Sequence, residues 1–261
     1  MNSALRTAAS GMAAQQTRTE VIANNLANIN TTAFKRSRAS FEDLLYQSIR
    51  DVQVVGNADA DTTGAIQVGR GVRLASVSRI NAQGSLEQTG RPLDLAVEGE
   101  GLFAVRMNTG ARAYTRDGGL EVSDQGVLVT KGGLTIEPGI RIPEGATDIS
   151  IGRTGVVSVL RPGGELVEIG RIALHRFPNP AGLLSLGENL YTETPASGTP
   201  LEGAPEDEGF GRIVQGYTEA SNVEIVQEMV EMIAAQRAYE INSKSVKTAD
   251  EMSEVASQMI R

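Results

Sequence analysis

The carboxyl-terminal stretch decides the fold, because it is the longest part of the chain with one clear period. Residues 221–260 read SNVEIVQEMVEMIAAQRAYEINSKSVKTADEMSEVASQMI, and they contain neither glycine nor proline. Ser221 and Glu224 have the spacing of a capping box, with Ser221 as the N-cap. The pattern predicts a helix from Asn222 to about Ile260, about 58 Å long at 1.5 Å per residue.

Apolar side chains recur along this predicted helix at intervals of three and four. They are Val223, Val226, Val230 and Ile233, followed after a one-residue phase shift by Ala234, Ala238, Ile241, Thr248, Met252, Val255 and Met259. A helix this long cannot wrap around a small core, so we expect it to pair with an element of similar length.

The amino-terminal segment is the expected partner. From Ser3 to about Asn28 there is no proline and a single glycine. Apolar residues again recur at three and four, with Gln15 and Thr19 between them; they are Leu5, Ala8, Met12, Ile22, Leu26 and Ile29. This spacing predicts a helix of about 39 Å with a partly polar, coiled-coil-like stripe.

The middle of the chain has a different period. Short β-type runs follow one another about ten residues apart, with glycine, proline, asparagine or aspartate between them. The runs are Val72–Ile80, Leu93–Val97, Leu102–Arg106, Leu128–Thr130, Val156–Leu160, Leu166–Phe177 and Arg212–Tyr217. Residues 40–46 predict a short helix, and the polar, glycine-rich residues 51–71 predict a loop or an extended hairpin.

The expected fold class is therefore α+β, with long terminal helices packed as a coiled-coil-like pair and an antiparallel β-rich domain inserted between them. We divide the chain into a terminal-helix domain (1–32 and 222–261), a short helix plus extended loop or hairpin (33–75), and a β-rich domain (76–221).

Composition limits the possible functions of the 261 residues. Aromatic residues make up only 4%, so the core must be aliphatic, and a net charge of −8 argues against binding to nucleic acid or anionic lipid. The absence of cysteine excludes disulfides and thiolate sites. No apolar run is long enough to span a membrane, and the first twenty residues lack the apolar core of a cleavable signal peptide.

The chain contains no constellation typical of catalysis, a cofactor or a metal. His175 is the single histidine, and it alternates with Leu174 on a predicted strand, so we expect a surface or edge residue. Asp59 to Gly64 resembles the start of a calcium loop, but Arg70 stands where the loop needs a glutamate. Glu206-Asp207-Glu208 is expected to be a solvated loop.

Five motifs in a fixed order carry a family resemblance that extends over nearly the whole chain. Two lie at the helical ends and three lie between them: residues 23–35 (ANNLANINTTAFK), 94–105, 114–118 (YTRDG) with 126–130, 187–191 (GENLY) and 236–244 (QRAYEINSK). Together they resemble the bacterial flagellar rod and hook family. Ala33 stands where that family commonly has glycine, the residue that a left-handed turn favours.

The resemblance implies a structural subunit, not an enzyme, that polymerises into a hollow helical drive shaft and transmits torque to the hook. Residues 34–47 look most like the distal type of rod subunit. The alternatives are a proximal rod or hook subunit and, remotely, a secreted β-rich enzyme acting on peptidoglycan. The resemblance further implies a basal-body location, from the periplasm to the outer membrane, and export by the flagellar type III apparatus. The implied partners are further copies, other rod subunits, hook subunits and surrounding ring proteins.

Two groups of residues are candidates for these contacts. The subunit-packing candidates are Ile22, Asn24, Asn25, Leu26, Asn28, Val226, Met229, Met232, Ile233, Tyr239 and Ile241. The candidates specific to a distal rod are Phe41, Leu44, Leu45 and Tyr46. The asparagines are either a polar helix face that leads into a turn or amides that fix the register of packed helices. The methionines either belong to the core of one subunit or adapt to neighbouring subunits.

Overall fold

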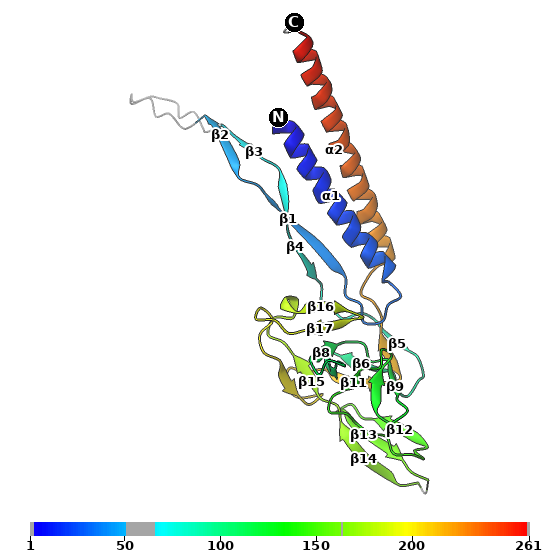
Figure 1. The fold of residues 1–261 in the computed structure, drawn as a ribbon. Coiled ribbons are helices and arrows are strands. Elements are labelled where there is room, and N and C mark those ends of the chain that lie inside the picture. Colours follow the sequence, from blue (N-terminus) through cyan, green and yellow to red (C-terminus); the bar gives the residue numbers. More distant parts are fainter. Residues whose placement is uncertain (1–2, 51–65, 163, 260–261) are drawn as a thin grey trace. The chain divides into compact units, whose positions relative to one another are not determined.

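The computed structural model describes residues 3–50, 66–162 and 164–259, and the chain divides into two compact units (Figure 1). The helical unit comprises Met1–Ala27, Ser37–Arg79 and Glu224–Arg261, and the β unit comprises Asn28–Arg36 and Ile80–Val223. The backbone therefore passes from one unit to the other four times along the sequence.

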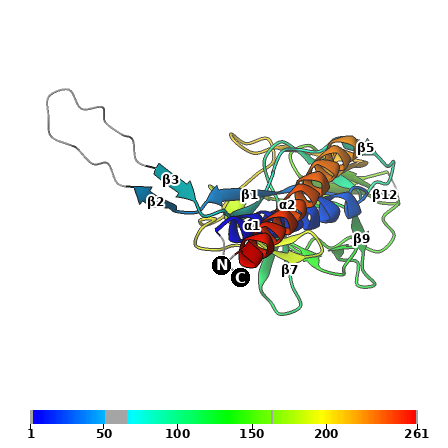
Figure 2. The same cartoon turned by 90° about the horizontal axis from the view of Figure 1, so that it is seen from above.

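Two long helices form most of the helical unit. Helix α1 spans Ser3–Ala27 and helix α2 spans Ile225–Met259, and they pack against each other. They run in opposite directions along each other in both views (Figures 1 and 2). The prediction of an amino-terminal helix, a carboxyl-terminal helix and a β-rich middle is confirmed, and the fold is α+β.

The predicted capping box at residues 221–224 is wrong. The backbone N–H of Glu228 donates to the carbonyl of Glu224 at 3.0 Å, and α2 begins only at Ile225. The hydroxyl of Ser221 has no hydrogen-bond partner among the described residues. The reason lies in Asn222, whose side chain binds the backbone of Arg36 and Ile80 and so holds this segment in a non-helical conformation.

A two-stranded ribbon completes the helical unit. Strand β1 (Ser37–Asp43) pairs with β4 (Val72–Arg79), and β2 (Tyr46–Arg50) pairs with β3 (Ile66–Gly69). The predicted short helix over residues 40–46 is therefore wrong. Such a helix would have only about two turns, too short to be stable alone, whereas β4 offers a complete hydrogen-bonding partner. The calcium-like residues 59–64 lie outside the described residues.

The β unit consists of short strands, and every pairing among its described strands is antiparallel. Its largest sheet has the order β16-β17-β8-β7-β11-β10-β9, beside a three-stranded sheet β12-β13-β14 and the pairs β15–β18, β19–β6 and β20–β5. The bounds are β5 Leu86–Gln88, β6 Leu95–Glu98, β7 Phe103–Arg106, β8 Arg112–Thr115, β9 Leu120–Val122, β10 Leu128–Thr130, β11 Thr135–Ile136, β12 Asp148–Ile151, β13 Val156–Leu160, β14 Leu166–Arg171, β15 Leu174–Arg176, β16 Leu184–Gly187, β17 Leu190–Thr192, β18 Leu201–Gly203, β19 Arg212–Gln215 and β20 Tyr217–Glu219, with a 3₁₀ turn at Pro180–Gly182.

The core of the β unit is aliphatic, as the low aromatic content predicts. Phe103 is the one aromatic residue in its main buried cluster, whose other members are Leu95, Val97, Val105, Ala113, Leu120, Leu128, Ile136, Ile140, Ile151, Val157, Ile172, Leu174 and Ile213. A second cluster gathers the aromatic side chains of Tyr114, Phe177 and Tyr191. The predicted run Leu166–Phe177 forms two strands in different sheets, since β14 pairs with β13 and β15 with β18.

Candidate assembly surfaces

The two helices bury few side chains against each other, and several of these are small. Ala14 on α1 and Ala235 on α2 are buried. A Cβ atom added to Gly11 would lie 2.9 Å from Nδ2 of Asn242, so α1 and α2 approach closely at this point. Farther along, Arg18 contacts Glu231 at 3.4 Å. Small and polar residues therefore make up much of the contact between the two helices.

Asn25 is the residue that ties three segments of the helical unit together. It is buried, and its amide forms a two-way pair with the backbone of Ser37: Oδ1 accepts from the N–H, and Nδ2 donates to the carbonyl, both at 2.9 Å. Nδ2 also donates to Oε2 of Glu228 at 3.1 Å, and Glu228 is itself fully buried. One amide thus fixes the register of α1, α2 and the start of β1.

The neighbouring packing candidates have different environments. Ile22 is buried, Leu26 is half-buried, and Asn24 is exposed. Asn28 ends the segment in a turn, where its backbone carbonyl accepts from the N–H of Thr31 at 3.1 Å and its Oδ1 from the Thr31 hydroxyl at 3.2 Å. Of the three asparagines, Asn25 is thus the one that the structure places between packed elements.

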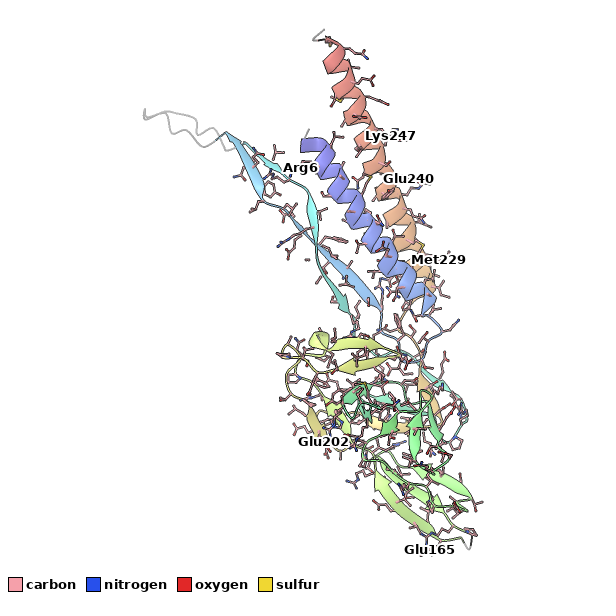
Figure 3. The ribbon with its side chains drawn as sticks, in the orientation of Figure 1. Arg6, Glu165, Glu202, Met229, Glu240 and Lys247 are labelled. Atoms are coloured by element: carbon pink, nitrogen blue, oxygen red, sulfur yellow. The ribbon has the colours of Figure 1, made fainter. Side chains whose placement is uncertain are left out.

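Helix α2 exposes a long row of apolar side chains. Among its described residues only Glu228 and Ala235 are buried, whereas ten large hydrophobic residues are at least 44% exposed. They are Ile225, Val226, Met229, Val230, Ile233, Tyr239, Ile241, Met252, Val255 and Met259. Figure 3 labels Met229, Glu240 and Lys247 along this helix. Five packing candidates belong to this row, which we call the α2 apolar row, and the sixth, Met232, is half-buried. A row of this size on a soluble chain is typical of an interaction surface.

The ribbon carries the four candidates specific to a distal rod. Phe41 is half-buried opposite Leu74, and the N–H of Leu44 donates to the carbonyl of Gly71 at 2.8 Å. Leu45 is 87% exposed and Tyr46 is 58% exposed. Two of these side chains are thus held by the ribbon, and two project from it.

A second contact with α1, besides that of Asn25 with Ser37, attaches the ribbon at Gly71. A Cβ atom added to Gly71 would lie 2.2 Å from Oγ of Ser10, and the φ of Gly71 is +109°, so only glycine fits there. Oγ of Ser10 also accepts from the N–H of Val72 at 3.2 Å. The hydroxyl of one helical residue therefore fixes where β4 begins along α1.

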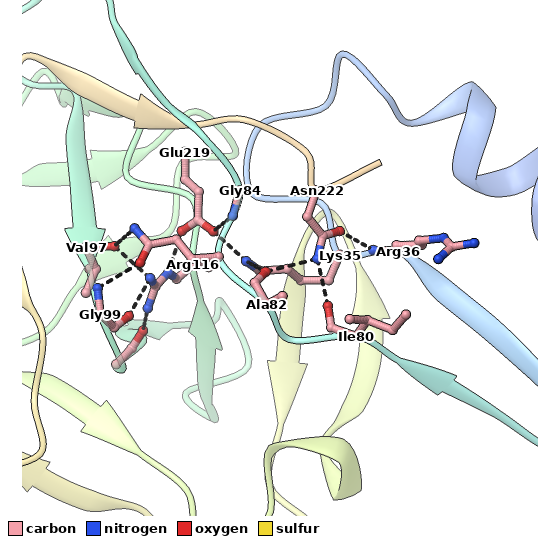
Figure 4. Close-up of polar contacts among 12 residues, drawn as sticks. Lys35, Arg36, Ile80, Ala82, Gly84, Val97, Gly99, Arg116, Glu219 and Asn222 are labelled. Atoms are coloured by element: carbon pink, nitrogen blue, oxygen red, sulfur yellow. Dashed lines mark hydrogen bonds and ion pairs between the residues drawn. The ribbon is translucent and has the colours of Figure 1, made fainter. Parts of the chain in front are cut away.

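In the β unit, one carboxylate joins three separate segments (Figure 4). Oε1 of Glu219 accepts from Nζ of Lys35 and, at 2.9 Å, from the N–H of Gly84, while Oε2 accepts from Nε of Arg116 at 2.6 Å. All three charged side chains are buried. We call Lys35, Arg116 and Glu219 the buried charge triad.

Backbone carbonyls and one amide complete this network. Arg116 donates to the carbonyls of Val97 and Gly99 at 2.6 Å, and Lys35 donates to that of Ala82 at 2.9 Å. Asn222 accepts from the N–H of Arg36 at 2.7 Å and donates to the carbonyls of Ile80 and Ala82 at 2.8 and 2.9 Å (Figure 4). Residues 35–36, 80–84 and 219–222 are therefore held together inside the β unit.

Electrostatics explains why the carboxylate of Glu219 stays ionised although it is buried. Burial raises the pKa of Glu219, but the charge of Arg116 and the hydrogen bonds from Lys35, Arg116 and Gly84 outweigh it, so the net pKa lies below its usual value. Burial lowers the pKa of Lys35, and Glu219 opposes that shift only in part. Two cations thus stabilise one buried anion.

Comparison with known proteins identifies the family. The profile described as "Flagella basal body rod protein" matches residues 5–35, "Flagellar hook protein FlgE/F/G D1 domain" matches 96–159, and "Flagellar basal body rod FlgEFG protein C-terminal" matches 214–259. The flagellar basal-body rod protein FlgG of Caulobacter vibrioides is 49% identical over 98% of both chains. The chain belongs to the flagellar basal-body rod family. FlgG of Borreliella burgdorferi is 45% identical over 100% of both chains, whereas FlgF of Caulobacter vibrioides is 34% identical over 91% of this chain and 89% of its own.

This rod-family chain is a structural component of the flagellar basal body, not an enzyme, and the FlgG relatives agree with the resemblance to the distal rod subunit. No helix in the described part of the chain is long and apolar enough to cross a membrane. Across the described residues there is also no group of three or more histidine, aspartate or glutamate side chains that could hold a metal ion.

Ala33 adopts a backbone conformation that is unusual for a residue other than glycine. Ala33 has a φ of +59° although it is not glycine, and it is buried. Its N–H donates to the carbonyl of Glu219 at 2.7 Å. The left-handed turn at this position is therefore formed by an alanine, at a cost of about 1–2 kcal/mol of backbone strain.

Sequence reasoning missed the partners of the functional side chains. Glu228 and Ser37 were not connected with Asn25, and the triad was not foreseen, although Lys35 and Arg116 both stand inside family motifs. The presence of a lysine and an arginine inside these motifs was the available signal. Which acid each of them meets depends on contacts between residues more than a hundred positions apart.

Replacing Asn25 should destabilise the helical unit. Asn25→Ala leaves the backbone of Ser37 and the carboxylate of Glu228 without their amide partner, and we expect a loss of about 3 kcal/mol. Asn25→Asp should reduce the free energy of unfolding further, because the new carboxylate would face the carbonyl of Ser37 and the carboxylate of Glu228. Urea unfolding followed by helical circular dichroism measures both. Gln16→Ala removes an exposed amide from the same helix and should change stability by no more than about 0.5 kcal/mol. Equal effects of Asn25→Ala and Gln16→Ala would contradict this role for Asn25.

Replacing Glu219 should destabilise the β unit and change its response to acid. Glu219→Gln leaves two buried cations uncompensated, and we expect a cost of about 3–5 kcal/mol at neutral pH. Because the folded-state pKa lies below the unfolded value of 4.5, the stabilisation from Glu219 is complete above that value and is lost as the pH falls through the folded pKa.

Urea unfolding at a series of pH values, followed by tyrosine fluorescence, measures the effect. The acid-side loss of stability should be smaller in Glu219→Gln than in the wild type. Glu165→Gln, which changes an exposed carboxylate in the hairpin between β13 and β14, should keep the wild-type pH dependence. A wild-type acid profile in Glu219→Gln would show that the triad does not set the pH dependence.

Proposed function

We propose that this protein polymerises through its terminal helices into the distal part of the flagellar rod, a hollow helical shaft that transmits torque from the motor to the hook. The observation that carries the proposal is the α2 apolar row, which the single chain leaves exposed. A surface that meets a different surface on the next copy generates an open helical assembly. In such an assembly each copy would cover the row of its neighbour.

The spacing of contacts between α1 and α2 supports coiled-coil-like pairing. Gly11 lies against Asn242, and Asn25 bonds to Glu228, so the contacts recur after 14 residues on both helices. Fourteen residues are two heptads, the repeat that keeps two helices in contact along a seam. Pairing of this kind leaves the outer face of α2 available for other copies.

We assign the layers of the shaft by the character of their surfaces. Residues 1–32 and 222–261 would form the inner tube, and residues 76–221 the outer layer, with residues 33–75 between them in sequence. The aliphatic core of the β unit is buried within that unit, which suits an outer layer in contact with water and ring proteins. Other rod subunits, hook subunits and the surrounding rings are the further partners of this proposal.

The distal position is favoured over a proximal rod or hook position by sequence similarity. Identity is 45–49% to the FlgG relatives described above but 34% to FlgF. We further propose that the subunit leaves the cytoplasm through the flagellar type III apparatus, and that the shaft crosses the periplasm to the outer membrane.

Placing a charge in the α2 apolar row should block polymerisation without unfolding the subunit. Ile233 is 55% exposed, so Ile233→Asp should leave the stability of the monomer nearly unchanged. Loss of one buried isoleucine at the contact corresponds to at least about 2 kcal/mol, or roughly a 30-fold higher critical concentration. Light scattering of purified protein measures the critical concentration for polymerisation, and electron microscopy shows whether polymers form.

The polymerisation assay should be run at raised salt, because a net charge of −8 makes copies repel one another. Gln236→Asp introduces the same charge on an exposed position three residues away and should polymerise with a critical concentration within about threefold of the wild type. The proposal is wrong if Ile233→Asp assembles at the wild-type concentration.

The ribbon tests the choice of a distal rod. Leu45→Ser combined with Tyr46→Ser should leave unfolding within about 0.5 kcal/mol of the wild type, because both side chains are largely exposed. The double variant should nevertheless reduce incorporation into the rod of motile cells, measured by isolating basal bodies. Ser76→Ala, on the neighbouring strand β4, is the control. Exchange of residues 36–75 for those of a proximal rod or hook subunit should alter where the protein incorporates, and an unchanged location would remove the reason for preferring the distal rod.

A further inference from the structure

A cleft of about 670 Å³ opens in the β unit, apart from the triad and from the helices. Its walls come from the ends of several strands that lie far apart in sequence. The lining residues are Arg106, Arg112, Glu137, Pro138, Arg171, Ala173, His175, Glu202, Gly203 and Ala204. No family motif of the sequence analysis explains this collection.

Positive charge predominates in the cleft although the chain is acidic overall. Three arginines face two glutamates. Arg106 and Arg112 both bind Glu137, at 3.1 and 2.7 Å, and so neutralise it. Arg171, at the end of β14, is exposed and has no acidic partner among the described residues. The cleft therefore keeps an excess of positive charge, and Arg171 is the arginine in it whose guanidinium is free to bind a ligand.

The same cleft contains a buried polar side chain without a hydrogen-bond partner. His175 was predicted to lie at the surface, but it is only 3% exposed, because Leu174 packs into the main core and Tyr114 covers the imidazole at 5.5 Å. Neither ring nitrogen has a hydrogen-bond partner in the described part of the chain. Nε2 lies 3.6 Å from Oε2 of Glu202, beyond hydrogen-bonding distance.

The backbone of His175 is hydrogen-bonded to both neighbouring segments. Its N–H donates to the carbonyl of Leu102 at 2.9 Å, and its carbonyl accepts from the N–H of Leu102 at 2.8 Å. On the other side, β15 pairs with β18, which sets His175 opposite Glu202. These bonds fix the main chain at His175, and its imidazole, with one N–H to donate and one nitrogen to accept, belongs to the wall of the cleft.

We propose that this cleft binds an oxyanion, a carboxylate or phosphate group, with the guanidinium of Arg171 supplying charge and the imidazole of His175 supplying a hydrogen bond. A guanidinium presents a planar fork of donors that matches two oxygens of such a group. Three arginines exclude a cation as the ligand, and an apolar ligand would leave the buried ring nitrogens unpaired. Glu202 at the rim opposes the ligand and keeps binding weak.

Binding should change the protonation of the histidine. Burial lowers the pKa of His175, and the nearby charges of Glu202 and Glu137 oppose this, whereas Arg112 adds to it. A bound anion adds negative charge beside the ring and should raise that pKa, so affinity should increase as the pH falls toward it. The cleft lies within the β unit alone, so this inference does not depend on polymerisation.

The chain offers an unusually direct probe, because His175 is its single histidine. The imidazole signal of the full-length protein can be followed by NMR while inorganic phosphate replaces chloride at constant, low ionic strength. We expect a saturable shift with a dissociation constant on the order of millimolar. Arg171→Gln should weaken binding by about tenfold or more, and Glu202→Gln should strengthen it.

Arg161→Gln is the matched control, since Arg161 is exposed in the hairpin at the other end of β14 and does not line the cleft. It should bind phosphate as the wild type does. Thermal unfolding of each variant checks that the β unit is intact. The inference is overturned by a shift that does not saturate, by an equal shift with chloride, or by unchanged binding in Arg171→Gln when that variant is folded. Acetate in place of phosphate then tells whether the cleft prefers a carboxylate.

Discussion

Lys35 and Arg116 are cations held away from water, and a single carboxylate, that of Glu219, neutralises both of them. Neither cation could remain buried without it, because an uncompensated buried charge costs several kcal/mol. The three residues come from segments that are distant in sequence, and two of them, Lys35 and Glu219, lie close to points where the chain leaves the β unit. The carboxylate also accepts from the N–H of Gly84, the backbone carbonyl of Glu219 accepts from the N–H of Ala33, and Asn222, three residues on, delays the start of α2.

The helical unit uses different residues for two purposes: one set fixes the register of its helices, and another set presents apolar surface outward. Its inner contacts use small residues and hydrogen bonds, as at Gly11 and Asn25, which specify register but bury little apolar area. Its large aliphatic side chains face outward on α2. At about 25 cal/mol per Å² of apolar surface, most of the hydrophobic free energy of these helices is thus gained only when something else covers α2. This arrangement suits a subunit that must remain separate until it reaches the end of a growing polymer.

The sequence was sufficient to predict elements with a long, regular period. Both terminal helices follow from the spacing of apolar residues, and most predicted strands are present with small changes at their ends. Three local predictions failed because a distant partner outweighed a local signal. Residues 40–46 have helical spacing but pair with β4, Ser221 has the form of a cap but Asn222 is bound elsewhere, and His175 alternates with a core residue but is covered by Tyr114. The partners Glu219 and Glu228 could not be assigned, because nothing in one sequence states which acids approach which buried side chains.

The four passages of the chain between the helical unit and the β unit have a mechanical consequence. Two modules joined by one peptide segment deform like springs in series with that segment, so a single soft linker sets the compliance of the whole. Four segments act in parallel, so their stiffnesses add, and each segment carries only part of the torque that a single linker would carry. In the β unit, three of these segments are also cross-linked by the triad and by Asn222, which shortens the length of backbone free to twist. We therefore expect the two units of one subunit to twist little against each other under torque. A single linker between the same domains could not provide this stiffness.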